Sequence, residues 1–187
     1  MTILYKLTDE NGRTRNNTQW GDGITHEAMG RNVCLCSDGW IHAYLSPELA
    51  VLLNPIHAGF LAPRLWLAEG EVGAAEGQLK VGCKSLTTVH ELPLPSVSME
   101  QRVCFGILCA LAVYDDPAFA AWAQRWLSGA DRSAESAESA SMASKAAAIA
   151  VGARGRTWET WAARAATWAA AKADVDLIAL AKQAVKL

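Results

Sequence analysis

Two of the five cysteines, Cys34 and Cys36, are separated by a single residue. Paired zinc ligands usually lie two to four residues apart, because the turn between them must direct both thiolates at one ion. We expect residues 33–36 to form a short strand, in which the two sulfur atoms would lie about 7 Å apart, too far for a normal disulfide. The remaining cysteines add no second pair with metal-ligand spacing. The sequence therefore predicts no metal site.

The four histidines are scattered along the chain. A cysteine–histidine nucleophile pair would have to be assembled by the fold, and no local motif supports one. His42 has apolar neighbours and is equally consistent with a hydrogen-bonded core histidine and with a pocket residue. The glycine patterns of the two common phosphate-binding loops are absent, so we expect no nucleotide site of either class.

The composition narrows the class of protein. Of 187 residues, 51% are hydrophobic and 19% are charged, and the formal net charge is −2. These values exclude a wholly disordered chain and argue against a strongly basic nucleic-acid binder or a polyanionic DNA mimic. The first residues lack the pattern of a secretory signal, and no apolar stretch of about 18 residues predicts a membrane span. We expect a soluble cytosolic protein with reduced thiols.

The elements that must position these side chains change in character near Pro93 and Pro95. Two prolines so close together disfavour both a helix and a central strand, so they mark a connector. The sequence predicts an α+β fold in which a small N-terminal sheet-containing portion precedes helices. Its parts are an α+β domain at residues 1–95, a packed helical hairpin at 96–130 and an Ala-rich helical tail at 131–187.

Before the connector, alternating apolar residues predict strands at residues 2–7 and 64–72. In the second strand, Glu69 and Glu71 would share one face with two leucines. Residues 13–30 are polar and rich in Gly and Asn, which indicates a loop-rich segment.

One helix is expected in this first part, at residues 46–53. Ser46 can cap its N-terminus and Pro47 suits the first helical position. Asn54 and Pro55 are expected to end it.

After the connector, Ser98 and Gln101 form a capping box at the start of a helix. Asp116 followed by Pro117 predicts the start of another. A long helix is expected at residues 157–187, where apolar residues again recur at helical spacing.

One side of that last helix carries a stripe of five residues: Trp158, Trp161, Ala165, Trp168 and Val175. Such a stripe usually packs on a core or on another helix, and three tryptophans are too much apolar surface to leave in water. We expect it to be buried against Trp122, Trp126 and Leu111 or against a second copy of the chain. The remaining possibility is that it binds a partner protein.

The chain contains a distinctive set of segments, at residues 4–9, 18–26, 34–44, 52–58, 63–66, 80–83 and 100–103. Together they resemble a family of small uncharacterised proteins of phages and prophages, whose members often carry an Ala/Trp-rich helical tail like residues 158–171. The resemblance covers most of the chain. It implies a phage accessory product that is not part of the virion shell and acts in the cytoplasm of the host bacterium. The family brings no known activity.

The order of the first elements is also similar to that of ADP-ribosyltransferases. In that superfamily the first and central strands build a nicotinamide pocket, and a later glutamate orients the ribose or the acceptor. The resemblance implies an NAD site at these positions: Tyr5 or Lys6, then His42, Tyr44 and Ser46, and then Glu69 or Glu71. Lys6 stands where an arginine or a histidine is expected, and no clear catalytic glutamate motif follows.

These observations favour a phage-encoded accessory protein, without a cofactor, that binds and inhibits or redirects a bacterial host protein. A defence system such as CRISPR–Cas is the kind of target that this origin suggests, which would make the protein an anti-CRISPR. The alternative is an NAD-dependent enzyme of the ADP-ribosyltransferase type. The third possibility is an assembly protein that forms a dimer through its last helix. The many tryptophans, which are common in interaction hot spots, favour binding.

Overall fold

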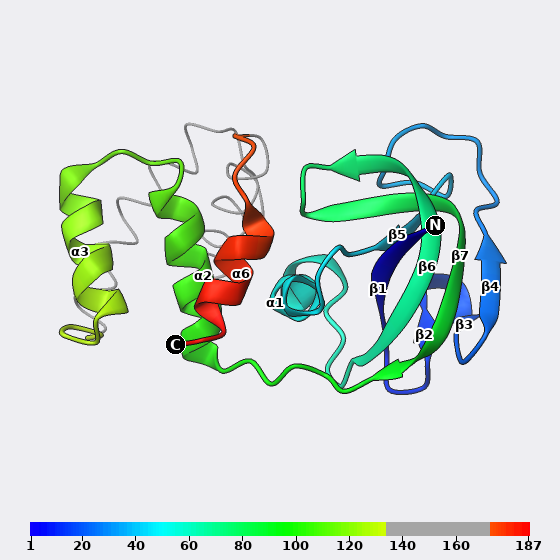
Figure 1. Ribbon diagram of the computed structural model, residues 1–187, viewed down its shortest axis with the longest axis horizontal. Coiled ribbons are helices and arrows are strands. Elements are labelled where there is room, and N and C mark those ends of the chain that lie inside the picture. The colour runs from blue at the N-terminus through cyan, green and yellow to red at the C-terminus, as the bar shows by residue number, and fades with distance from the viewer. Residues whose placement is uncertain (134–172) are drawn as a thin grey trace. The chain divides into compact units, whose positions relative to one another are not determined.

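The computed structural model describes residues 1–133 and 173–187. The chain divides into two compact units, Met1–Val97 and Ser98–Leu187 (Figure 1). The first unit contains the sheet, and the described residues of the second unit form helices only. The expected α+β fold, with strands first and helices afterwards, is confirmed.

The first unit has seven strands and one α-helix. In chain order they are β1 (Thr2–Thr8), β2 (Arg13–Thr14), β3 (Thr18–Gln19), β4 (Ile24–Glu27), β5 (Ile41–Ala43), α1 (Pro47–His57), β6 (Arg64–Glu76) and β7 (Lys80–Leu92). The strand expected at residues 2–7 is confirmed. The segment 13–30, expected to be loop-rich, contains three short strands, because β2 and β3 pair with each other and β4 pairs with β7.

Five strands form one sheet in the order β1–β6–β7–β4, with β5 pairing with β7 as well. The sheet also closes on itself. The Tyr5 N–H donates to the Tyr44 carbonyl, the Tyr44 N–H donates to the Tyr5 carbonyl, and both N···O distances are 2.9 Å. This pair joins β1 to the end of β5, so β1, β6, β7 and β5 enclose a small barrel.

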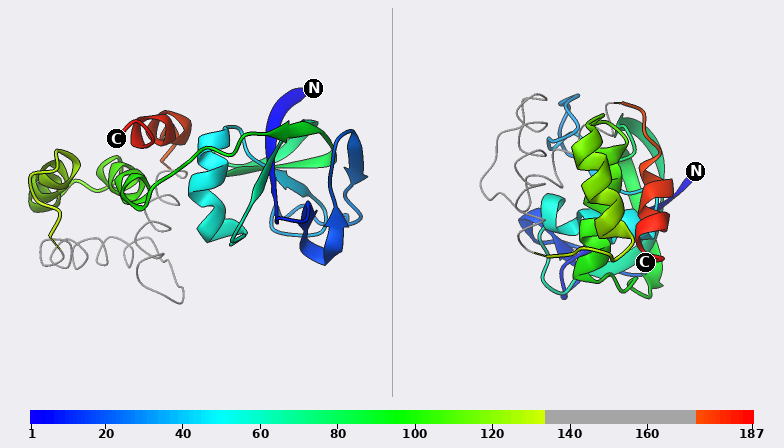
Figure 2. Two further views of the ribbon diagram at one scale, coloured as in Figure 1. Left: turned by 90° about the horizontal axis from the view of Figure 1, so that it is seen from below. Right: turned by 90° about the vertical axis from the view of Figure 1, so that its left-hand side faces the viewer.

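Apolar side chains fill the barrel from every strand that encloses it. They are Leu4, Trp20, Ala43, Ala68, Val81, Cys83 and Leu86. On the opposite face of β1, Leu7 is also buried, where α1 packs beside β1 (Figures 1 and 2). The strand β1 therefore has apolar side chains on both faces over part of its length.

Helix α1 begins where the sequence predicts. The Ser46 hydroxyl accepts a hydrogen bond from the Leu49 N–H, and Pro47 is the first helical residue. The expected end at Pro55 is wrong, because α1 continues to His57. A proline removes one backbone donor, and the Asn54 carbonyl still accepts the N–H groups of the residues after the helix.

The second unit contains α2 (Met99–Leu111), α3 (Pro117–Leu127) and α6 (Leu177–Ala184). The capping box of Ser98 and Gln101 and the Asp116 cap are confirmed. Helix α6 packs on α2, where the Gln101 Nε2 donates to the Val185 carbonyl over 2.9 Å. Within residues 1–133 and 173–187, no helix is long and apolar enough to span a membrane.

The structure does not show the long helix expected at residues 157–187. Asp174 adopts a positive φ of 56°, and the Asp176 carboxylate caps a new helix by accepting from the Ala179 N–H. Aspartate competes for backbone hydrogen bonds in this way, which the apolar periodicity did not reveal. Four members of the predicted stripe lie outside the described residues, namely Trp158, Trp161, Ala165 and Trp168. Val175, the fifth, is half-buried.

A substitution of Thr8 tests the contribution of its hydroxyl to the stability of the barrel. The buried Trp66 Nε1 donates to the Thr8 Oγ1 over 3.0 Å. Thr8→Val keeps the shape but leaves the indole N–H without this acceptor, so the free energy of unfolding should fall by about 1–3 kcal/mol. Thr2→Val, at an exposed position of the same strand, should change it by less than about 0.5 kcal/mol. Urea titration checks both values, and equal effects would contradict this assignment.

Candidate functional site

A loop at residues 28–40, which connects β4 to β5, is held to the strands at several points. Its start is attached to β7, because the Ala28 N–H donates to the Lys84 carbonyl over 2.8 Å. Its two ends are also joined, since the Gly30 N–H donates to the Asp38 carbonyl over 3.0 Å. Compact surface loops whose ends lie close together are frequently functional. We call residues 28–40 the braced loop.

The strand expected at residues 33–36 is wrong. Leu35 and Cys36 lie in a turn, and the Ser37 hydroxyl donates to the Cys34 carbonyl over 2.6 Å. The Asn32 side chain accepts from the Cys34 N–H over 2.9 Å. Short polar side chains offer the backbone an alternative to a strand ladder, and two of them flank this apolar run.

Two lysines of β7, Lys80 and Lys84, attach the braced loop to this strand. The Lys84 Nζ donates to the Gly39 carbonyl over 2.6 Å and lies 4.0 Å from the centre of the Trp40 ring. The Lys80 Nζ donates to the Cys36 sulfur over 2.9 Å. Each ammonium therefore joins the loop to the barrel by a charged interaction, which is stronger than one between neutral groups.

His42 provides a third attachment. Its Nε2 is hydrogen-bonded to the Leu35 carbonyl, and because a carbonyl only accepts, Nε2 carries the proton. Burial is the main cause that lowers the pKa of His42, and the Leu35 carbonyl acts in the opposite direction. His42 is therefore a half-buried, hydrogen-bonded histidine, and its ring positions the loop.

Glycines on β6 and β7 let the braced loop lie close to these two strands. A Cβ atom at Gly82 would lie 2.5 Å from Cδ1 of Leu35, and one at Gly73 would lie 2.7 Å from the Trp40 ring. Glycine inside a strand commonly marks such a close approach. The sequence contained this signal, but it did not identify the segment that makes the approach.

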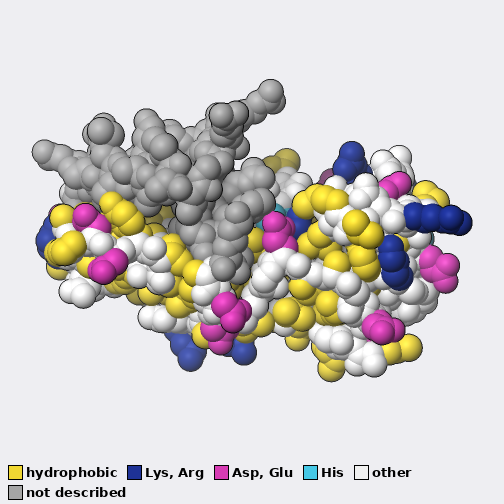
Figure 3. All heavy atoms as spheres, turned by 90° about the horizontal axis from the view of Figure 1, so that it is seen from above, with side chains coloured by type: hydrophobic (Ala, Val, Ile, Leu, Met, Phe, Trp, Pro, Cys, Tyr) yellow, Lys and Arg dark blue, Asp and Glu magenta, His cyan; other side chains and the backbone are white. Residues whose placement is uncertain are grey.

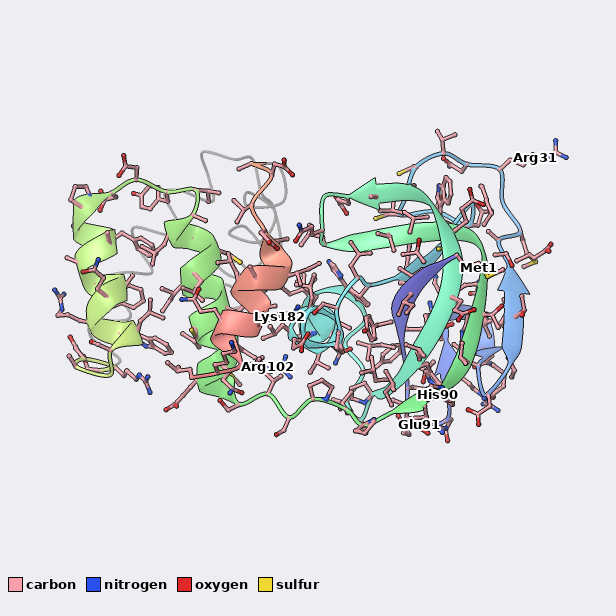
Figure 4. The ribbon with its side chains drawn as sticks, viewed as in Figure 1. Met1, Arg31, His90, Glu91, Arg102 and Lys182 are labelled. Atoms are coloured by element: carbon pink, nitrogen blue, oxygen red, sulfur yellow. The ribbon has the colours of Figure 1, made fainter. Side chains whose placement is uncertain are left out.

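The outer side of the braced loop presents apolar side chains to solvent. Met29 is 95% exposed and Val33 is 85% exposed. Between them, Arg31 points away from the strands (Figure 4). Figure 3 shows hydrophobic and charged side chains side by side on this side of the first unit. The arrangement is suited to contact with another protein.

A charged side chain lies inside the barrel, at the position where the sequence suggested a cofactor contact. Lys6 is buried, its Nζ donates to the His42 carbonyl over 2.7 Å, and it lies 5.0 Å from the centre of the Trp20 ring. Burial lowers the pKa of Lys6 to about 8, and Cys83 acts in the opposite direction. These contacts make Lys6 a structural group of the interior.

The structure brings some of the residues expected for an NAD site together and separates others. Tyr5 and Tyr44 pair through their backbones. The Tyr44 hydroxyl lies 3.2 Å from Nδ1 of His57, and burial raises the Tyr44 pKa. The buried Ser46 caps α1 and donates to Glu48 over 2.6 Å.

The two candidate glutamates lie elsewhere on the sheet. Glu69 and Glu71 are exposed on β6, and Glu69 is paired with Ile3 on one side and Thr87 on the other. An irregularity between Gly70 and Val72 changes the register of the pairing between β6 and β7 at Glu71.

Comparisons with protein-family models, curated proteins and solved structures find no match for this chain. Within the described residues, no three metal-ligating side chains come together.

Removal of the buried charge should stabilise the barrel in a pH-dependent way. Below pH 8, Lys6 is protonated in both states, and burial of the charge destabilises the folded state. Between pH 8 and 10.5 the unfolded chain binds more protons, so wild-type stability rises with pH by about 3 kcal/mol from this group. Lys6→Met should lack that rise. The free energy of unfolding of Lys6→Met should exceed that of the wild type at pH 8, and the difference should shrink by about 3 kcal/mol by pH 10.5. Urea titration at several pH values measures both proteins.

If the free energies of unfolding of the wild type and Lys6→Met differed by the same amount from pH 7 to 10.5, the buried position of the Lys6 ammonium would be contradicted.

Proposed function

We propose that this protein is a phage-encoded accessory protein that acts by binding a bacterial host protein through the braced loop. The observation that carries the proposal is the exposure of Met29, Arg31 and Val33 on a loop that the barrel holds at several points. The resemblance to phage and prophage proteins supports a bacterial partner, such as a component of a defence system.

The chemistry of the three side chains supports a protein partner. Met and Arg are enriched at protein interfaces, and charged residues such as Lys and Glu are depleted there. Two nearly fully exposed apolar side chains lie two residues before and two residues after an arginine in this loop. A partner that buries them would gain hydrophobic area, and the guanidinium can pair with a carboxylate at the edge.

The attachments to the barrel support the same conclusion. A loop that is already ordered loses less conformational entropy on binding than a loop that must be ordered by its partner. His42, Lys80 and Lys84 contact Leu35, Cys36 and Gly39 of the braced loop, so these contacts order the loop in the free protein.

The apolar contact is tested by the double variant Met29→Ser/Val33→Ser. Host proteins captured by the wild-type chain would be identified by mass spectrometry, purified and titrated by calorimetry. The double variant should bind the purified partner at least about tenfold more weakly, because each buried side chain contributes roughly 1 kcal/mol or more. The matched control is Leu61→Ser, since Leu61 is 100% exposed in a different loop. Unchanged binding by the double variant, or an equal loss in the control, would contradict the proposal.

The shape of the loop is tested separately by Gly39→Ala. A Cβ atom there would lie 2.0 Å from the Asn32 backbone carbonyl, so the loop cannot keep its conformation. Affinity for the partner should fall about as far as in the double variant, although Met29 and Val33 are intact. Circular dichroism should show that the sheet is retained. Full affinity in a folded Gly39→Ala protein would show that the loop conformation does not matter.

Calorimetry with NAD separates binding from the ADP-ribosyltransferase alternative. Under the proposed function, NAD should give no binding heat. A heat that disappears in Glu69→Gln or Glu71→Gln would favour the enzyme instead.

A further inference from the structure

Cys34 and Cys36 are the two exposed thiols among the cysteines, all of which lie within the described residues. The other three, Cys83, Cys104 and Cys109, are buried, and burial raises the pKa of each of their thiols. The thiolate is the reactive form of cysteine, and cysteines in apolar interiors are inert. Any thiol chemistry of the folded protein must therefore take place in the braced loop.

The turn in the braced loop shortens the distance between the Cα atoms of Cys34 and Cys36. In a strand their separation would forbid a disulfide, but Leu35 and Cys36 lie in a turn. Two Cα–Cα steps of about 3.8 Å, bent through a turn, span about 5.5 Å. This lies inside the range of about 4.4–6.8 Å that disulfides require.

The two thiols differ in their surroundings. The Lys80 Nζ lies 2.9 Å from the Cys36 sulfur and 3.7 Å from the Glu76 carboxylate, and its side chain is only 13% exposed. The hairpin of β6 and β7 therefore holds the Lys80 ammonium beside the Cys36 sulfur. A lysine next to the sulfur is one of the environments that mark reactive cysteines. The described contacts of Cys34 are made by its backbone, to Asn32 and Ser37.

We propose that Cys34 and Cys36 form a thiol–disulfide exchange site for small disulfides of the glutathione type. Cys36 attacks first, because its sulfur is the one in contact with the Lys80 ammonium, and Cys34 resolves the mixed disulfide. The site is independent of the partner-binding function proposed above, since it needs only the folded chain and the small disulfide.

The exchange proceeds in two balanced steps. The Cys36 thiolate attacks one sulfur of the small disulfide, which forms a mixed disulfide on Cys36 and releases one small thiolate. The Cys34 thiolate then attacks the Cys36 sulfur, which forms the Cys34–Cys36 disulfide and releases the second small thiolate. The two cysteines lose two electrons and two protons, and the small disulfide is reduced to two thiols.

The test uses the reduced, full-length protein and glutathione disulfide. Trypsin cuts after Arg31 and Arg64, so residues 32–64 form one peptide that contains only these two cysteines. The wild-type peptide should lose two hydrogens. Cys34→Ser should accumulate the mixed disulfide on Cys36, and Cys36→Ser should react at least about fivefold more slowly.

Lys80 is a positioning residue, and its role is tested against a matched lysine. Lys80→Gln should slow formation of the Cys36 mixed disulfide about fivefold, and Lys80→Arg should restore the rate. Lys84→Gln removes the other lysine that holds the loop but no contact with sulfur, and it should change the rate by less than about twofold. These rates are measured in the Cys34→Ser background by quenching with acid.

Three results would overturn the proposal. One is a peptide that stays reduced while the buried cysteines react. Another is a disulfide that joins two chains, visible on a non-reducing gel. The third is an equal effect of Lys80→Gln and Lys84→Gln, which would show that the lysine matters only for the conformation of the loop.

Discussion

The backbone pair between Tyr5 and Tyr44 is the constraint on which the arrangement of the first unit depends. Without it, β5 would be a three-residue strand attached to the sheet by β7 alone. With it, the end of β5 is fixed between β7 and β1, and the sheet encloses an interior. The chain that leads into β5 must then cross the outer surface of β7, where the braced loop lies.

The closed sheet also creates two kinds of lysine environment, one inside the barrel and one on its outer surface. Lys6 is buried in the interior, where its ammonium contacts the His42 carbonyl and the Trp20 ring. On the outer surface, Lys80 and Lys84 come from the same strand and reach the same loop. His42 takes part on both sides, because its carbonyl contacts Lys6 inside and its ring contacts the loop outside.

Local signals in the sequence predicted part of this structure. The α+β order, the strand β1, and the caps at Ser46, Ser98 and Asp116 follow from patterns of a few residues, and the structure confirms them. Side chains that act on distant backbone were not predictable in this way. The turn at Cys34–Ser37 depends on Asn32 and Ser37, whose hydrogen bonds compete with a strand that the apolar pattern favours.

The candidate site was predicted less well than the fold. The sequence drew attention to His42, Lys6 and the two neighbouring cysteines, but it could not show that the lysines of β7 hold the loop. Those contacts join residues more than 40 positions apart, and periodicity carries no information about such pairs. Gly73 and Gly82 leave room for the braced loop, and only the folded structure shows that Trp40 and Leu35 lie against them.

The central claim is that the barrel holds the braced loop in one conformation before any partner binds. Hydrogen–deuterium exchange of the free protein tests it most directly. The amides of Ala28, Gly30 and Gly39, which donate to Lys84, Asp38 and Ser37, should exchange much more slowly than those of an unstructured chain. Exchange of all three at the rates of an unstructured peptide, while the amides of β6 and β7 stay protected, would contradict the account.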